Sequence, residues 1–141
     1  MPRYWLNTFD RESWQFFLGL SESMLGSKWP RPGISLGDIF LCYVRSEGKL
    51  PGVWTSAERV VSQMKFDDRL IYKGGVWPYR WDVAPVVSRR LPEAGLIGRD
   101  LARDLEMFAA LGPSHWGSAL RTQGREMLRK DGETLIELLG S

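Results

Sequence analysis

The stretch of residues 37–54, GDIFLCYVRSEGKLPGVW, constrains the fold of this chain most strongly. Residues 39–44 form a run of apolar, aromatic and β-branched side chains, which is typical of a strand buried on both faces. Residues 46–49 follow as a turn signal, after which Leu50, Val53 and Trp54 begin an apolar partner segment. The stretch therefore predicts a β-hairpin in the middle of a sheet, and the rest of the chain must cover both of its faces.

A chain of 141 residues is long enough to bury a core of its own, and we expect a single domain over residues 1–141. Its one cysteine, Cys42, lies within the apolar strand, which indicates a core residue and excludes an internal disulfide. With His115 as the one histidine, a Cys/His zinc site within the chain is excluded, and no other cofactor is indicated. No apolar run is long enough to span a bilayer and no leader precedes the first strand, so we expect a soluble cytoplasmic protein.

The charge of the chain is only mildly basic, with a net charge of +2 and a pI of about 8.8, so charge alone predicts no polyanionic partner. The seven tryptophans are more unusual, because indole rings are costly to expose to water and stack well on flat groups. Trp29 stands between Lys28 and Pro30 with no apolar period around it. We therefore expect Trp29 to be exposed or to line a pocket.

The N-terminal part of the chain predicts a strand, a helix and a loop. Residues 4–9 alternate between apolar and polar, which is typical of a half-buried strand. Asp10 follows as a helix cap. Apolar residues at helical spacing come next: Trp14, Phe17 and Leu18. Gly, Ser and Pro then interrupt any pattern over residues 19–36, so we expect a long loop of the kind that often carries function.

The rest of the chain adds strands and then helices. We expect the sheet to continue over 58–64 and a long strand over 76–91, in which Pro78 and Pro85 mark an edge, a strand end or a bulge. Helices are expected over 97–111, 113–120 and 134–139, with Gly132 as an interruption before the last. The order predicts an α+β fold whose mixed or antiparallel sheet curls into a barrel flanked by helices.

Several motifs in this order resemble one known group of domains. They are the opening YWLN, the loop with Trp29, the pairs Gly37-Asp38 and Gly52-Val53, the stretches VWPYRWDV and SRRLP, and finally Trp116, Leu120-Arg121 and RKDG at 129–132. Together they resemble the EVE domains and the related YTH domains of the PUA-like superfamily, over nearly the whole chain. The nearer resemblance is to the prokaryotic EVE proteins, because a helix is expected to close the chain after Asp131.

The resemblance implies a barrel-like mixed sheet with a pocket for one modified base that is flipped out of a nucleic acid. In YTH domains aromatic side chains surround the methyl group of methylated adenine, and EVE domains are associated with modified cytosines in DNA. By position, Trp29 matches the loop tryptophan of this aromatic cage and Tyr72 matches the second aromatic residue. Because YTH domains normally have a tryptophan at the second place, Trp77 and Trp54 stay open as the residue that completes the cage.

The resemblance also implies polar contacts. Asn7 and Thr8 match the residues that read the edge of the base. Lys130 matches the basic residue of a turn near the C-terminus, where it would contact a phosphate. Further phosphate contacts are expected from Lys28, Arg31 and Arg80. We therefore expect a non-catalytic reader of DNA or RNA that carries a methylated or hydroxymethylated base, which serves effector proteins in trans and needs neither a cofactor nor a membrane.

Plainer explanations compete with this one. Tryptophans at apolar-periodic positions are expected in the core: Trp5, Trp14, Trp81 and Trp116. Arginines at four-residue spacing fit a solvated helix face better than a basic stripe: Arg121, Arg125 and Arg129. His115 stands alone, so no catalytic constellation is visible. Two alternatives stay open, a PUA- or ASCH-like domain that binds RNA without regard to modification and a small-molecule or protein-interaction module that uses the same pocket.

Overall fold

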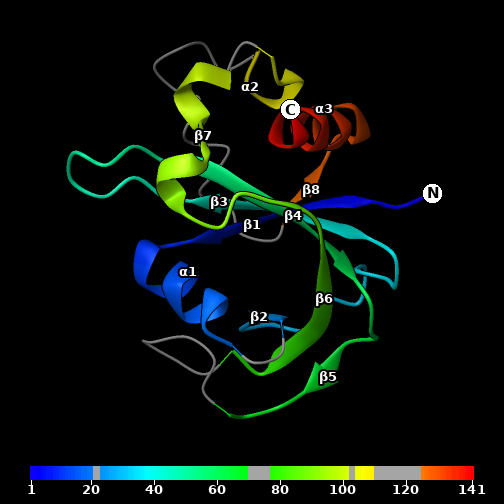
Figure 1. The fold of residues 1–141 in the computed structure, drawn as a ribbon. Coiled ribbons are helices and arrows are strands. Elements are labelled where there is room, and N and C mark those ends of the chain that lie inside the picture. The colour runs from blue at the N-terminus through cyan, green and yellow to red at the C-terminus, as the bar shows by residue number, and fades with distance from the viewer. Residues whose placement is uncertain (21–22, 70–76, 102–103, 110–124) are drawn as a thin grey trace.

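The structure is a computed structural model that describes residues 1–20, 23–69, 77–101, 104–109 and 125–141. A curled sheet runs through the molecule, with helix α1 on one side and helices α2 and α3 on the other (Figure 1). The strands are β1 (Tyr4–Phe9), β2 (Met24–Ser27), β3 (Ile39–Val44), β4 (Val53–Val60), β5 (Lys65–Phe66), β6 (Tyr79–Ser88), β7 (Leu96–Ile97) and β8 (Glu126–Met127). The helices are α1 (Arg11–Leu18), α2 (Glu106–Ala109) and α3 (Arg129–Gly140), with short 3-10 turns at Pro92–Ala94 and Gly98–Leu101.

The sheet is mixed, as the sequence predicts. Its strand order is β2-β6-β4-β3-β1-β8, with β5 beside β6 and β7 beside β4. β1 runs parallel to β3, whereas the other neighbouring strands pair antiparallel. β6 is long and strongly curved, and β2 and β5 flank the end of it that lies at the bottom of Figure 1. The prediction of an α+β fold with a curled mixed sheet is therefore confirmed.

The predicted hairpin forms the centre of this sheet. β3 and β4 pair antiparallel along their length, with one bulge that follows Cys42. Every residue of β3 is buried, which confirms a strand covered on both faces, and Cys42 is a core residue as expected. The partner strand begins at Val53 rather than at Leu50, because Leu50 pairs with Glu47 inside the turn.

Side chains on the two faces of the sheet form two separate cores, because successive residues of a strand point to opposite faces. The α1-side core consists of Trp5, Phe9, Trp14, Phe17, Met24, Leu25, Ile34, Phe40, Cys42, Val44, Val53, Val60, Trp81 and Val83. The α3-side core consists of Tyr4, Leu6, Ile39, Leu41, Tyr43, Trp54, Ala57, Leu105, Met127, Leu135 and Leu139. Helix α1 thus closes one face and α3 the other.

Local signals in the sequence also hold in the structure. Asp10 caps α1, since its carboxylate accepts a hydrogen bond of 2.7 Å from the backbone N–H of Ser13. Pro78 lies just before the first residue of β6, and Pro85 lies where the register between β4 and β6 shifts. Both prolines therefore sit where no ladder donor is needed, at a strand end and at a bulge.

The core tryptophans are placed as predicted in the part of the chain that the structure describes. Trp5, Trp14 and Trp81 are buried, whereas Trp116 lies outside the described residues. Trp14 stacks on Phe17 with ring centroids 5.2 Å apart. Its indole N–H also donates to the backbone oxygen of Arg90 at 2.8 Å, which ties α1 to the chain that follows β6.

Some predicted boundaries are wrong. Met24–Ser27 forms β2 within the predicted loop. Pairing with β6 holds these four residues extended, and their own sequence pattern is too weak to predict a strand. The strand predicted over 58–64 is the end of β4, which stops at Val60. The described part of the helix predicted over 97–111 contains the end of β7, a 3-10 turn and α2 instead. The helix predicted over 113–120 lies outside the described residues.

The C-terminal helix is longer than predicted, because Gly132 belongs to it. α3 begins at Arg129, and Gly132 is buried in its first turns. A Cβ at this position would lie 2.4 Å from Cδ1 of Tyr4 in β1. The glycine therefore permits a close approach between helix and strand and does not interrupt the helix. None of the helices among the described residues is long and apolar enough to cross a membrane.

Candidate functional site

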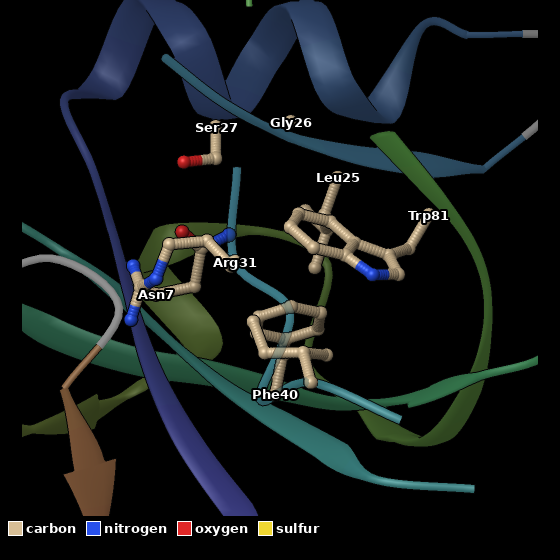
Figure 2. Close-up of a pocket in the computed structure, with 8 residues that line it drawn as sticks. Asn7, Leu25, Gly26, Ser27, Arg31, Phe40 and Trp81 are labelled. Carbon is tan, nitrogen blue, oxygen red and sulfur yellow. The ribbon is translucent and has the colours of Figure 1, made fainter. Parts of the chain in front are cut away.

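A pocket opens on the α1 side of the sheet, where β1, β2, β3 and β6 come together (Figure 2). Its lining residues are Asn7, Leu25, Gly26, Ser27, Arg31, Ile34, Phe40 and Trp81. Figure 2 shows Asn7 and Arg31 on one side, Leu25 and Trp81 on the other, and Phe40 below them. The free volume inside is about 10 Å³, which is room for about one water molecule. The pocket is thus a narrow hollow with one polar and one aromatic wall.

Strand alternation and register explain why these side chains meet. Asn7 lies between Trp5 and Phe9 in β1, and all three point to the α1 side. In the pairing of β2 with β6, Leu25 stands opposite Trp81, so both point into the same space. Asn7 is 4% exposed, which means that its amide lies inside the hollow and away from bulk water.

Asp38 fixes the loop 28–38, which forms another wall of the pocket. Its carboxylate accepts hydrogen bonds of 3.0 Å from the backbone N–H groups of Arg3 and Ser35 and from the indole of Trp5. The guanidinium groups of Arg3 and Arg31 lie over the Trp5 ring, 4.7 and 5.9 Å from its centroid. These contacts hold the cationic head of Arg31 beside the pocket.

The start of the same loop is more open. Trp29 is 73% exposed and is held by its backbone N–H, which donates to the hydroxyl of Ser27 at 3.2 Å. Lys28 is exposed too, and its ammonium lies 4.8 Å from the centroid of the Trp77 ring. The ammonium of Lys28 and the exposed indole of Trp29 therefore directly follow Ser27, the last residue of β2, which lines the pocket.

The indole N–H of Trp81 has no acceptor among the described residues although Trp81 is 2% exposed. A buried donor without a partner is costly, and such atoms in native proteins call for an explanation such as a water or a ligand. The residue that carries this donor lines the pocket.

Glu58 is a second polar group inside the α1-side interior. It stands opposite Phe40 in the pairing of β3 with β4 and is 4% exposed. Burial raises the pKa of its carboxyl to about 7, against the lowering effects of the Ser56 hydroxyl at 3.5 Å and the charge of Arg90. One carboxyl oxygen, Oε2, receives no hydrogen bond within the part of the chain that the structure describes. The carboxyl therefore holds its proton up to near-neutral pH.

The structure brings only part of the predicted base pocket together. Asn7 lines the pocket, but the side chain of Thr8 points to the other face of β1 and does not line it. Trp29 lies in the solvent at its margin, and Trp77 is half-buried against the α1-side core without lining the hollow. Tyr72 lies outside the described residues.

Trp54 does not complete a cage. It is fully buried in the α3-side core, where its ring meets the edge of Tyr43 with centroids 5.1 Å apart. The physical reason is again alternation, since Val53 and Trp54 are neighbours in β4 and must point to opposite faces. Val53 points to the α1 side, which leaves Trp54 on the wrong face for the pocket.

Of the residues predicted to contact phosphates, some lie near the pocket and others do not. Lys28 and Arg31 lie at the pocket, whereas Lys130 is exposed in the first turn of α3, the helix that covers the other face. Arg80 is fully buried, so the prediction that it meets a phosphate is wrong for this structure. Its Nε donates to the backbone oxygen of Trp77 at 2.9 Å, and its Nη1 lies 3.4 Å from the carboxylate of Asp67.

Asp131, which belongs to the same basic-Asp-Gly motif as Lys130, has a structural role. Its carboxylate accepts hydrogen bonds from the backbone N–H groups of Glu106 and Met107, at 2.7 and 2.9 Å. These are free N–H groups at the start of α2, so Asp131 links α2 to α3. Within the ranges that the structure describes, no group of three or more potential metal ligands comes together.

The sequence did not reveal that Trp81, Ser27 and Phe40 belong to the pocket. Trp81 was expected to be only a core residue, and it is both buried and part of the lining. One usable signal was the alternation of Trp77, Tyr79 and Trp81, which places three aromatic side chains on one face of a strand. Nothing in the sequence showed that this face meets the short strand β2.

Comparisons of the whole chain place its fold. No protein-family model matches the chain, and no curated protein matches it significantly. Among solved structures, the YTH domain of Mmi1 in complex with RNA superposes with a TM-score of 0.67 at 12% identity, covering 99% of this chain and 78% of that one.

Two further structures agree with it. The YTH domain of Zygosaccharomyces rouxii MRB1 in complex with N6-methyladenosine RNA gives a TM-score of 0.66 at 12% identity, covering 99% of this chain and 85% of that one. Human THYN1 in complex with DNA that contains 5-methylcytosine gives 0.61 at 12% identity, covering 99% and 98%. These likenesses show that the chain shares its fold with YTH domains and THYN1, and they do not distinguish an EVE domain.

Proposed function

We propose that this protein is a non-catalytic reader that holds one modified base of a DNA or RNA strand in the pocket between Asn7 and Trp81. The observation that carries the proposal is the composition of that pocket. Flat side chains, Trp81 and Phe40, face polar and cationic ones across a single hollow. A methylated base has matching chemistry, since it is a flat, polarisable ring with hydrogen-bonding atoms on its edge and an added apolar group.

Each part of the pocket has its own task in this proposal. Trp81 and Phe40, whose rings meet edge to face with centroids 5.8 Å apart, contact one face of the base, which is a stabilising but base-tolerant interaction. The amide of Asn7 and the unpaired indole N–H of Trp81 read the edge of the base. Lys28 and Arg31 contact the flanking phosphates, so affinity falls as salt is added.

A base needs more room than the hollow of about 10 Å³ offers. The loop 28–38 is the wall that can yield, because Asp38 anchors its far end while its near end carries the exposed Trp29. We propose that residues 28–31 swing outward to admit the base and that Trp29 then closes over it as the second aromatic face. Binding would therefore order the Trp29 side chain.

The solved structures support the class of ligand. The chain shares its fold with a YTH domain in complex with N6-methyladenosine RNA and with THYN1 in complex with 5-methylcytosine DNA. Since these proteins are about 12% identical to this chain, the base that this pocket prefers must be found by experiment.

Titrations with oligonucleotides test the proposal. Short strands of DNA with one 5-methylcytosine and of RNA with one N6-methyladenosine are compared with their plain counterparts at one salt concentration. We expect one modified strand to bind more tightly than its plain counterpart. Asn7→Ala should weaken that binding about tenfold, the value of one hydrogen bond to a buried edge. Thr8→Ala is the matched control, because Thr8 is the next polar residue of β1 and points away from the pocket.

The same titration separates the alternatives. The Mmi1 YTH domain is described in complex with RNA, which favours a second candidate function, the binding of RNA without regard to modification. Equal affinity for modified and plain RNA would support that function over the first. Failure to bind any of the strands would overturn both and leave a small-molecule or protein-interaction module.

A further inference from the structure

Phe66 is an exposed aromatic residue outside the pocket. It is 69% exposed, and among the described residues only Trp29 is an aromatic side chain with a larger exposed fraction. Its ring meets the ring of Tyr79 at 5.7 Å between centroids and an angle of 77°, an edge-to-face contact that fixes the orientation of both rings. One face of a rigidly held phenyl ring is thus left open to solvent.

The strand register places this pair on the pocket face of the sheet. Tyr79 of β6 stands opposite Ser27 of β2 on one side and opposite Phe66 of β5 on the other, so all three share a face. Ser27 lines the pocket, and Trp81, two residues after Tyr79, lines it as well. Two residues of a strand span about 7 Å. The aromatic pair therefore lies on the same face of the sheet as Trp81 and Ser27, one residue pair along the strands from the pocket lining.

The charges around the pair suit a base better than a phosphate at this point. Lys65 pairs with Asp82 at 2.8 Å on the opposite face of the strands, and Arg69 pairs with Asp67 at 2.6 Å. The two faces differ because Lys65 and Phe66 are neighbours in β5. Phe66 and Tyr79 are uncharged, so the pair offers a flat, uncharged surface, and Tyr79 stands opposite Ser27, the residue that precedes the cationic Lys28.

We propose that Phe66 and Tyr79 form a stacking platform for the base next to the flipped one in a single strand of DNA or RNA. The inference rests on the proposed function and adds a second contact point to it. Phe66 stacks on the neighbouring base, and Tyr79 holds the Phe66 ring in place from beneath. The platform is indifferent to base identity, because every base has a face on which a ring can stack. It makes the site specific for single-stranded or opened nucleic acid.

Variants of Phe66 test the platform against short single strands that carry 5-methylcytosine or N6-methyladenosine. Phe66→Leu keeps an apolar side chain and removes the flat ring, whereas Phe66→Tyr keeps the ring. We expect Phe66→Leu to lower the affinity about 5- to 100-fold and Phe66→Tyr to change it by less than about twofold. Leu91→Ala is the control, since Leu91 is 63% exposed and lies beyond the other end of β6. It should bind as the wild type does.

A second set of strands shows what Phe66 contacts. In these strands the base on the 5′ or the 3′ side of the modified base is replaced by an abasic site. If the platform stacks that base, wild type and Phe66→Leu bind the strand that is abasic on the stacked side equally well. Equal binding of wild type and Phe66→Leu to the intact strand would overturn the platform alone. An equal loss of affinity for Phe66→Leu on every strand, intact or abasic, would also overturn the platform alone. If the wild type binds no strand, the platform and the proposed function fail together.

Discussion

The two faces of the sheet bury a tryptophan in different surroundings. Trp54 on the α3 side and Trp81 on the α1 side are 0% and 2% exposed, and neither indole N–H has an acceptor among the described residues. Trp54 is packed against Tyr43 within an apolar core. Trp81 lines a hollow with Asn7 and Arg31. The same residue type thus fills an apolar core on one face, whereas on the other it forms part of the wall of a hollow.

The difference comes from what covers each face. Helix α3 supplies Leu135 and Leu139, which fill the space over the α3 side. On the α1 side, the short helix α1 covers part of the sheet, and the strand β2 and the loop 28–38, which supplies Arg31 and Ile34, cover the region of the pocket. The carboxylate of Asp38 holds this loop, together with a hydrogen bond from Arg3 to the backbone oxygen of Gly33 and one from the Gly37 N–H to the backbone oxygen of Val60, and the loop leaves a narrow hollow beside Arg31.

The largest effect on the free energy of unfolding is expected from Trp54→Ala. This change leaves a cavity in the α3-side core, so it should lower the free energy of unfolding by about 3–5 kcal/mol. Thermal or denaturant unfolding measures it. Oligonucleotide binding at a temperature where the variant stays folded should be unchanged, because Trp54 faces away from the pocket. A loss of affinity in the folded variant would contradict the assignment of stability to the α3 side and of binding to the α1 side.

Glu58 gives the α1 side a dependence on pH. Burial raises the pKa of its carboxyl from 4.5 to about 7, so the folded state binds the proton more tightly than the unfolded state. Stability should therefore be highest below pH 4.5 as far as this group is concerned, and should fall by about 3 kcal/mol as the pH rises to 7. Glu58→Gln removes this slope, because the amide does not ionise. Identical pH profiles of unfolding for the two proteins would contradict the assignment.

Gly132→Ala tests how tightly α3 packs on the sheet. The new Cβ would lie 2.4 Å from Cδ1 of Tyr4, so the helix must move, at a cost of about 1–3 kcal/mol in the free energy of unfolding. Gly140→Ala is the matched control in the same helix, since its Cβ would meet Val87 at an ordinary 3.8 Å. A difference between the two variants is the expected result, and equal stability would show that the α3 side is less tightly filled than described.

Trp29→Ala should have the smallest effect on stability. The indole is 73% exposed, so the free energy of unfolding should change by no more than about 0.5 kcal/mol. Affinity for the preferred modified strand should fall by the value of one stacked base, about 1–3 kcal/mol. Denaturant unfolding and titration of the same preparation check both numbers. An unchanged titration curve would remove Trp29 from the binding surface.

The sequence was informative where a side chain pattern alone decides the structure. The apolar run of β3, the cap at Asp10 and the bulge at Pro85 depend on local chemistry and are confirmed. β2 was missed, because Leu25 and its neighbours are extended only through their pairing with β6. The contact of Gly132 with Tyr4 joins distant parts of the chain, and no local pattern reports it.

The site was harder to predict than the fold. Asn7 was placed in the base pocket by resemblance; in the structure it lines the hollow, and its contact with a base stays a prediction. Thr8 was assigned by the same resemblance, Trp54 stayed open as the residue that completes the cage, and Arg80 was expected to contact a phosphate, all without regard to which face of a strand each one occupies. Because successive residues of a strand point to opposite faces, a difference of one position decides whether a side chain contacts a ligand or lies in the core. Applying that rule to Trp77, Tyr79 and Trp81 would have pointed to the aromatic face of β6.

The most direct test follows the indole N–H signals of the tryptophans by NMR while a strand with 5-methylcytosine or N6-methyladenosine is added. Each tryptophan gives one such signal, so Trp81 and Trp54 report on the two faces in one experiment. If a modified base enters the pocket, the signals of Trp81 and Trp29 shift as the strand is added and the signal of Trp54 stays in place. A strand that binds to saturation and leaves the Trp81 signal unmoved would contradict the account.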